Sequence, residues 1–154
     1  MMKVYIKNKM FSLSGKSFVT DVNGNPVYNV KGRVFSPTRL KQICTLDGTP
    51  LYRVRNRFFN FLIHSSFIQT PEKKRIAKVK GRLFSAGFDI DIDGANYSVE
   101  GKWFSLESKI VRDGQVIGII RRNLSQVKDF FRDSFELEAN DNDIPFMIAL
   151  VIAI

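Results

Sequence analysis

The acidic side chains between residues 89 and 100 have the spacing of a calcium-binding loop. Asp89, Asp91 and Asp93 alternate along the chain, Gly94 follows, and Glu100 comes six residues after that glycine. Alternate carboxylates and a distal bidentate glutamate can wrap one hard cation such as Ca²⁺. Such a loop normally lies between helices, whereas Asp93-Gly94 has the residue types of a tight turn between strands. We therefore expect no metal site, and keep these four carboxylates as the calcium alternative.

The sequence gives no support for nucleophilic catalysis. His64 is the only histidine and Cys44 the only cysteine. A hydrolase needs a nucleophile beside a base, and neither a G-x-S-x-G elbow nor a glycine-rich phosphate-binding loop occurs. A single cysteine excludes an internal disulfide, and a single histidine excludes a zinc site built from several histidines. We therefore expect a protein that is not an enzyme and that uses no cofactor.

Cationic side chains are the remaining chemically active group, and they are unevenly distributed. The 154-residue chain has 24 Lys and Arg against 15 Asp and Glu, a net charge of +9. Residues 1–88 hold 17 basic and 3 acidic residues, a net of +14, whereas residues 89–154 hold 7 and 12, a net of −5. Such asymmetry is typical of a protein with an anionic partner at one face, either a membrane surface or a nucleic acid. The alternative is that the charges only keep the protein soluble and its strand edges unpaired.

A repeat of 20 to 25 residues positions these charges along the chain. Its marks are an aromatic residue followed by Ser, with two degenerate copies: Phe11-Ser12, Phe35-Ser36, Phe59-Asn60, Phe84-Ser85, Phe104-Ser105 and Leu124-Ser125. A turn signal stands between successive marks: Asn23-Gly24, Asp47-Gly48, Pro71-Glu72, Asp93-Gly94 and Asp113-Gly114. Asn-Gly and Asp-Gly suit the positive φ angles of tight hairpin turns. Each unit is therefore predicted to be a strand, a turn, a second strand and a corner at the mark.

The residues before each corner alternate between apolar and charged types. Five residues before the mark, all six are β-branched: Ile6, Val30, Val54, Val79, Val99 and Ile119. Two residues before it, all six are cationic: Lys9, Arg33, Arg57, Arg82, Lys102 and Arg122. Further cations at even spacing extend these rows: Lys7, Lys31, Arg53, Arg55, Lys78 and Lys80. This period of two predicts strands with one buried face and one face in water.

The six marked strands alternate with six others, near residues 16–21, 39–45, 63–70, 87–92, 107–112 and 130–138. Twelve antiparallel strands joined by short turns predict a mainly β protein, a closed twelve-stranded antiparallel barrel over about residues 2–138. We expect residues 1–154 to form this single domain. About eight strands already fill their own lumen with side chains, so something else must occupy the interior of twelve.

The apolar tail, residues 144–154, is the candidate for the lumen. It is apolar on all sides, which predicts a helix that is buried all round, over about residues 143–154. Asp141, Asn142 and Asp143 are candidates for its N-cap, and Pro145 fits a first turn. The alternatives are a thirteenth strand or a segment that reaches into a membrane.

The recurring pattern resembles the LURP-one-related family of the tubby C-terminal-like superfamily. The resemblance covers essentially the full chain, and its motif is the repeat itself, as in Lys9-Met10-Phe11-Ser12-Leu13, Val30-Lys31-Gly32-Arg33-Val34-Phe35-Ser36 and the closing Ile148-Ala149-Leu150-Val151-Ile152-Ala153-Ile154. It implies a twelve-stranded barrel around a hydrophobic C-terminal helix. Relatives include the tubby domains, which bind phosphoinositides at membranes, and the phospholipid scramblases. No motif allows tubby's headgroup residues to be placed on this chain. Relatives usually continue into a polar tail, so the sequence leaves open whether the chain is truncated at Ile154.

These observations predict weak peripheral binding of anionic phospholipid surfaces through a basic barrel face. The marked strands of the barrel would run the same way, so the cations two residues before each corner would form a belt near one rim. The predicted anion-binding residues are Lys7, Lys9, Lys31, Arg33, Arg53, Arg55, Arg57, Lys78, Lys80, Arg82, Lys102 and Arg122. Each such charge near an anionic bilayer contributes about 1 kcal/mol.

Two other functions and one unusual residue accompany this prediction. Nucleic acid is the disfavoured partner, because single-strand binders place stacking aromatics on the outer face, whereas Trp103, Tyr28, Tyr52 and Tyr97 occupy inward positions. A scaffold that binds another protein is the third class. Arg121 takes an inward position that is usually small, as a buried ion-pair partner or the mark of a bulge.

The compartment follows from the start of the chain. Met1-Met2-Lys3 leads into an alternating stretch rather than an apolar signal core. We therefore expect a cytoplasmic monomer that can lie at the inner face of a membrane.

Overall fold

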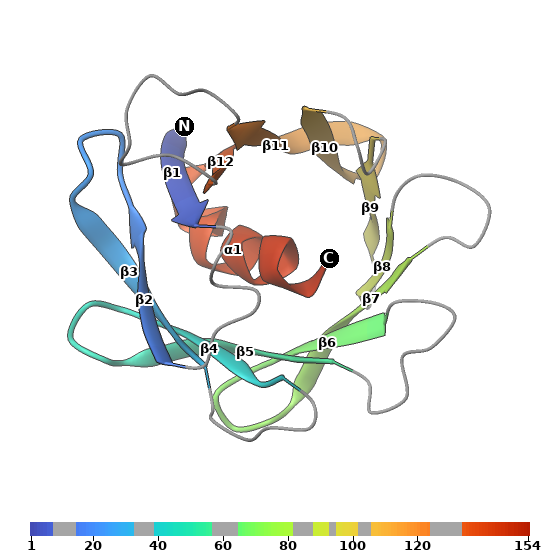
Figure 1. The fold of residues 1–154 in the computed structure, drawn as a ribbon. Helices are drawn as coiled ribbons and strands as arrows, with labels where there is room; N and C mark the ends of the chain where they lie inside the picture. The colour runs from blue at the N-terminus through green and yellow to red at the C-terminus, as the bar shows by residue number, and fades with distance from the viewer. Residues whose placement is uncertain are drawn as a thin grey trace.

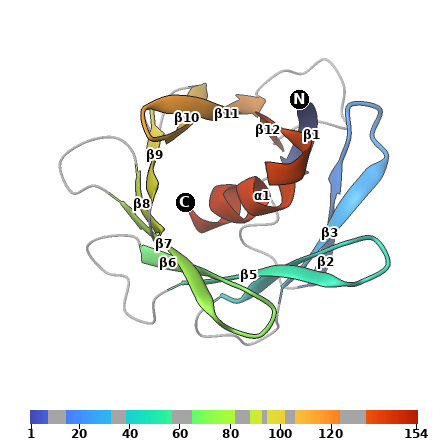
Figure 2. The same cartoon turned by 180° about the vertical axis from the view of Figure 1, so that it is seen from behind.

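The computed structural model describes residues 1–7, 15–32, 39–56, 65–81, 88–92, 95–101, 106–123 and 134–154. In this part of the chain, twelve strands form one closed antiparallel barrel (Figures 1 and 2). The strands are β1 (Met2–Lys7), β2 (Gly15–Thr20), β3 (Pro26–Gly32), β4 (Lys41–Cys44), β5 (Pro50–Asn56), β6 (Ser65–Gln69), β7 (Arg75–Gly81), β8 (Phe88–Ile92), β9 (Ala95–Glu100), β10 (Glu107–Arg112), β11 (Gln115–Asn123) and β12 (Ser134–Ala139). The predicted twelve-stranded barrel is confirmed.

The strands follow one another around the barrel in chain order. Each pairs with its neighbours in sequence, and β1 closes the barrel by pairing with β12 from Met2↔Ala139 to Lys7↔Ser134. The meander follows from the predicted short turns, since antiparallel neighbours can be joined by a few residues.

The turns adopt the backbone conformations that their residues favour. Gly24 and Gly48 have φ angles of 86° and 95° in the first two hairpins, and their amides donate to Asp21 O and Thr45 O at 3.1 Å. Asp113 and Gly114 both have positive φ, 50° and 80°, as a tight two-residue hairpin requires. The predicted turn Asp93-Gly94 joins two paired strands, since Ile92 stands opposite Ala95, but Asp93 and Gly94 themselves lie outside the described residues.

The tail forms the predicted helix inside the barrel (Figures 1 and 2). A 3-10 turn η3 (Asp141–Asp143) leads into α1 (Ile144–Ala153), with Asp143 at the N-cap position and Pro145 in the first turn. Asp143 makes no side-chain capping hydrogen bond. The helix packs mainly against β5 and β6, with further contacts to β12 and β4. No helix among the described residues is long and apolar enough to cross a membrane.

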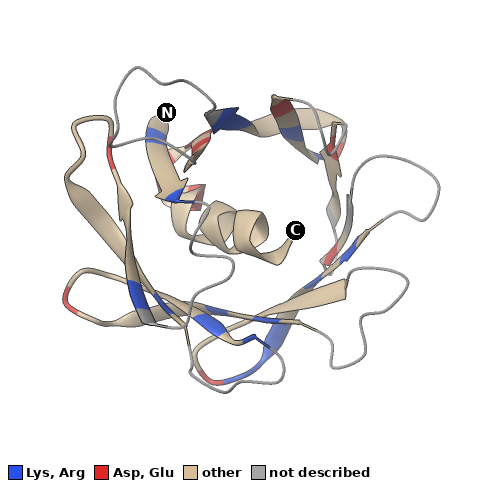
Figure 3. Ribbon diagram, in the orientation of Figure 1, with Lys and Arg blue, Asp and Glu red and all other residues tan. Residues whose placement is uncertain are grey.

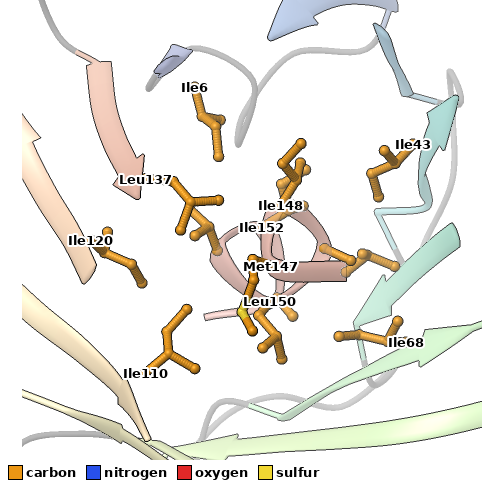
Figure 4. Packing of buried hydrophobic residues seen from close by; sticks show 14 of the residues in the cluster. Ile6, Ile43, Ile68, Ile110, Ile120, Leu137, Met147, Ile148, Leu150 and Ile152 are labelled. Atoms are coloured by element: carbon orange, nitrogen blue, oxygen red, sulfur yellow. The ribbon is translucent and has the colours of Figure 1, made fainter. Parts of the chain in front are cut away.

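The core joins the inward strand faces to this helix. Figure 4 shows Ile6, Ile43, Ile68 and other strand residues surrounding the helix side chains, which include Met147 and Leu150. The predicted inward residues of the first five repeats are buried: Ile6, Val30, Val54, Val79 and Val99. The inward tyrosines are also confirmed, since Tyr28, Tyr52 and Tyr97 pack against the core. The rings of Tyr52 and Tyr97 meet the ring of Phe146 edge-on, at centroid distances of 5.7 and 6.3 Å.

The sixth repeat is out of step with the prediction by one residue. Ile120 and Gly118 are buried on the inner face of β11, whereas Ile119, predicted to be inward, is only partly buried. The pairs Ile110↔Gly118 and Val111↔Val116 leave one extra residue between them, a β-bulge. The Leu124-Ser125 mark of this repeat lacks the aromatic residue that aligns the other five, so counting back from it gave the wrong alternation.

Candidate anion-binding face

A continuous row of side chains crosses the outside of the barrel from β2 to β7. Cross-strand partners define it, because each residue stands opposite the next: Lys16, Lys31, Gln42, Arg53, Gln69 and Arg75. We call this row the cation ladder. Strands lie about 4.8 Å apart, so the five steps span about 24 Å. Four of its six members are cations and none is acidic.

The ladder lies on the outer face because its members alternate with buried residues. Lys31 follows buried Val30, Arg53 precedes buried Val54, and Gln69 follows buried Ile68. Lys16, Lys31 and Arg75 are exposed, while Arg53 is half-buried. Figure 3 shows Lys and Arg following one another across these strands. The row is therefore exposed at its two ends and partly exposed in between.

Aromatic rings accompany the cations on this face. The Arg75 guanidinium lies 3.8 Å from the centroid of the Phe67 ring, and Lys16 Nζ lies 5.2 Å from that of Phe18. Phe67 also stands opposite Arg55 on β5 and Lys78 on β7. Within the described residues, the buried Nε of Arg55 has no hydrogen-bond partner. Each ring thus helps to hold a guanidinium or ammonium group in place without neutralising its charge.

The predicted site residues differ in their relation to the ladder. Lys31 and Arg53 belong to the ladder, and Arg55, Lys78 and Lys80 lie beside it. Lys7 lies on β1, away from it. Five predicted residues lie outside the described part of the chain: Lys9, Arg33, Arg57, Arg82 and Lys102.

Arg122 corrects the prediction. It was expected on the outer face, but it stands opposite Phe135 on the same face of β11 as Ile120, because of the one-residue offset in the sixth repeat. Its side chain is exposed, yet it does not continue the outer row.

Sequence reasoning missed four members of the ladder: Lys16, Gln42, Gln69 and Arg75. Lys16, Gln42 and Gln69 lie on the strands between the marked ones, where we followed no alternation. Arg75 begins the marked strand β7, nine residues before its corner and beyond the positions where we followed the alternation. The ladder also joins residues at different distances from their corners, since Lys31 is four and Arg53 six residues before the mark. This drift follows from the stagger that a closed barrel imposes between neighbouring strands.

The acidic end of the face marks its boundary at β8. Asp91 stands opposite Lys78, and Asp89 opposite Lys80. Glu100 stands opposite Lys109, and Asp93, the remaining residue of the calcium alternative, lies outside the described residues. Among the described residues, no group of three or more His, Cys, Asp and Glu side chains could hold a metal ion.

The opposite wall carries an ion-paired network centred on Arg121. The guanidinium donates to Glu107 Oε2, Glu136 Oε1 and Glu138 Oε2, each at 3.0 Å. Lys3 Nζ lies 3.0 Å from Glu136 Oε1, and the Tyr5 hydroxyl donates to Glu136 Oε2 at 3.1 Å. Arg121 is thus an ion-pair partner, as one alternative proposed, but it lies on the outer face and not in the predicted inward position.

The pKa values of this network follow from its geometry. Hydrogen bonds to Glu138, Glu107 and Glu136 raise the pKa of Arg121. Burial opposes ionisation of Glu136, but hydrogen bonds from Lys3 and Arg121 outweigh it and hold the pKa of Glu136 below its ordinary value. The charges of this network therefore satisfy one another.

The buried thiol of Cys44 lies near the ladder cations Lys31 and Lys16. Burial raises the pKa of Cys44, while the nearby ammonium groups of Lys31 and Lys16 oppose that rise. Lys41, also buried, has a pKa lowered by burial and by Arg39. The Cys44 thiol and the Lys41 ammonium group are both buried, so neither adds to the charge that the ladder exposes to solvent.

The fold and the repeat agree with comparisons to known proteins. The family model of LURP-one-related proteins matches residues 2–154. The chain belongs to the LURP-one-related family. Placement in the tubby-like superfamily is consistent with this membership.

One solved structure similar to this LURP-one-related chain is the X-ray structure of a protein from Arabidopsis thaliana. The TM-score is 0.66 at 19% identity, and the match covers 98% of this chain and 87% of that chain. At this identity the likeness supports the fold alone. Comparison with curated proteins finds no match.

Proposed function

We propose that this LURP-one-related protein is a non-enzymatic module that binds anionic phospholipid surfaces peripherally through its basic face. The observation that carries the proposal is the cation ladder, in which four cations cross six strands without an opposing carboxylate. A cation near an anionic bilayer contributes about 1 kcal/mol. Four of them are enough for reversible binding that weakens as salt screens the charges over about 8–10 Å.

Co-sedimentation with vesicles tests this function. We expect the protein to pellet with phosphatidylserine-containing vesicles at low salt, less at physiological salt, and not with phosphatidylcholine alone. The double variant Lys31→Glu/Arg53→Glu should weaken binding to the anionic vesicles by at least tenfold.

A matched variant separates the face from net charge. Lys109→Glu/Arg122→Glu changes the net charge by the same four units, but both residues are exposed on β10 and β11, away from the ladder. Its binding should stay within threefold of the wild type, once thermal melts show that both variants fold. Equal losses in the two variants, or no binding of the wild type at low salt, would refute the proposal.

Single-stranded nucleic acid is the second candidate, favoured by one specific observation. Phe18 and Phe67 lie on the outer basic face, where stacking aromatics would be needed. This weakens the argument from the inward tyrosines. Fluorescence anisotropy with a labelled oligonucleotide tests it: tight binding that Phe67→Ala reduces, together with no vesicle binding, would favour nucleic acid over lipid.

A further inference from the structure

Two neighbouring hairpin turns combine exposed apolar and cationic groups at one edge of the basic face. The turns are residues 45–49, between β4 and β5, and residues 70–74, between β6 and β7 (Figure 1). They are neighbours because β5 pairs with β6. We call these two turns, with Lys31 and Arg75, the contact rim. Its exposed apolar and cationic groups suit contact with the surface of an anionic membrane.

Leu46 is the apolar element of the contact rim. It sits at the tip of its turn with 49% of its surface exposed, although the hydrophobic effect favours burial of such a side chain. The turn behind it is well ordered by hydrogen bonds, since Thr49 N donates to Thr45 Oγ1 and to Asp47 Oδ1 at 3.1 Å. The side chain of Leu46 is therefore exposed to solvent on a turn that hydrogen bonds stabilise.

Cations lie at both turns of the contact rim. A Cβ built on Gly48 would lie 3.8 Å from Lys31 Nζ, so the ladder reaches the turn itself. Lys73, Lys74 and Arg75 are exposed at the neighbouring turn. The contact rim thus holds these four cations against two acids, Asp47 and Glu72, a net of +2.

The third turn keeps a lysine where the first two turns have glycine. Lys73 has a φ of 72°, and its amide donates to Thr70 O at 2.9 Å, as those of Gly24 and Gly48 do to their own turns. The left-handed conformation costs a non-glycine residue roughly 1 kcal/mol. A cation is thus present at this tip despite a conformational cost, which supports a role for its charge.

The other hairpin tips that the structure describes lack this combination. Val22 occupies the position equivalent to Leu46 in the first turn, but the acid Asp21 is the only charged residue there. Val116 follows the Asp113-Gly114 turn with 51% exposure, beside one cation, Arg112, and one acid, Asp113. An exposed apolar residue at a hairpin tip is therefore not particular to the contact rim, whereas the combination of such a residue with several cations is.

We propose that the barrel docks on anionic bilayers by the contact rim, with Leu46 inserted among the acyl chains at the interface and Lys31, Lys73, Lys74 and Arg75 on the headgroups. The inference rests on the proposed function and names the part of the basic face that touches the bilayer. Charge brings the rim to the surface, and burial of the leucine then adds a contribution that salt does not screen.

Paired substitutions of equal exposure test the insertion. Leu46→Ser should weaken binding to phosphatidylserine-containing vesicles about fivefold, equivalent to ~1 kcal/mol. Val116→Ser should change it by less than twofold. A fluorophore on Leu46→Cys should shift to the blue and become shielded from acrylamide when vesicles are added, whereas one on Val116→Cys should not. Cys44 is only 1% exposed, so the label goes to the introduced cysteine.

The outcomes separate the inference from the proposed function. If the wild type binds anionic vesicles but the two serine variants bind equally and the label at position 46 stays in water, the docking mode is overturned and lipid binding stands. If the wild type does not bind anionic vesicles at low salt, both are overturned.

Discussion

The two outer walls of the barrel treat charge in opposite ways. From β2 to β7, cations stand opposite cations or glutamines along the ladder. Across β10, β11, β12 and β1, Arg121 and Lys3 are bonded to three glutamates within 3.0 Å. Figure 3 shows blue segments across the first wall and red beside blue across the second. The ladder cations have no acidic residue opposite them, whereas Arg121 and Lys3 on the second wall are paired with glutamates.

Inside the barrel, the two walls differ in how much of the central helix they contact. The helix packs against β4, β5 and β6, under the basic wall, and on the other side it contacts mainly β12. Burial against the helix therefore stabilises the wall whose outer charges repel one another, whereas ion pairs across strands help to hold the other wall. We therefore expect the ladder cations to contribute little to folding and to remain available to an anionic partner.

The largest expected effect comes from the helix under the basic wall. Leu150 is fully buried, and Leu150→Ala should lower the free energy of unfolding by about 3 kcal/mol, as large-to-small core changes do. The same change at fully buried Ile110 on β10, Ile110→Ala, is the matched control. Urea denaturation gives the global loss for both variants.

Native-state hydrogen exchange locates that loss. Leu150→Ala should speed exchange in β4–β6 more than in β9–β10, and Ile110→Ala should do the reverse. Identical exchange patterns in the two variants would mean that the helix supports both walls equally, and the contrast between them would fail.

The next effect concerns the ion-paired wall. Arg121→Gln should lower the free energy of unfolding by about 1.5 kcal/mol, because Glu107, Glu136 and Glu138 lose their shared partner. The side chains are partly exposed, so high salt should shrink the loss. Glu107→Gln, which changes a more exposed end of the network, should cost about 0.3 kcal/mol.

The pH dependence of the Arg121 variant has a definite sign. Because the pKa of Glu136 is lowered in the folded protein, its contribution is present above the ordinary glutamate pKa of about 4.3 and disappears as the pH falls through the lowered value. The difference between wild type and Arg121→Gln should therefore narrow at acid pH. A difference that is constant from pH 7 to pH 3 would contradict this account.

The fold was largely predictable because the repeat is local. The turn residues and the alternation in five of the six repeats are properties of the neighbouring sequence, and the structure confirms them at Ile6, Val30, Val54, Val79 and Val99. The sixth repeat failed because its mark, Leu124-Ser125, lacks the aromatic residue that aligns the others, and because the pairing of Arg121 with Glu136 is set across strands. Local spacing carries no information about such contacts.

The candidate site was predictable only in part for the same reason. Counting cations found Lys31 and Arg53, but the register of the barrel decides that Lys16 and Arg75 join them in one row. Likewise, Lys78 counted as a free cation until pairing placed Asp91 opposite it. Whether a surface cation is paired with an acid depends on its neighbour on the next strand. A one-residue change of register would give each cation another neighbour.

A small expected effect of the opposite sign gives the sharpest contrast between the walls. Lys31 stands directly opposite Lys16, and like charges at such positions repel. Lys31→Gln should therefore raise the free energy of unfolding by about 0.4 kcal/mol at low salt and by less at 0.5 M salt, while weakening binding to anionic vesicles. Arg121→Gln removes the same charge from the other wall and should lower stability without weakening binding. If Lys31→Gln instead destabilised the protein in urea at low salt, the ladder would be part of what holds the barrel together, and its cations would not be charge kept free for a partner.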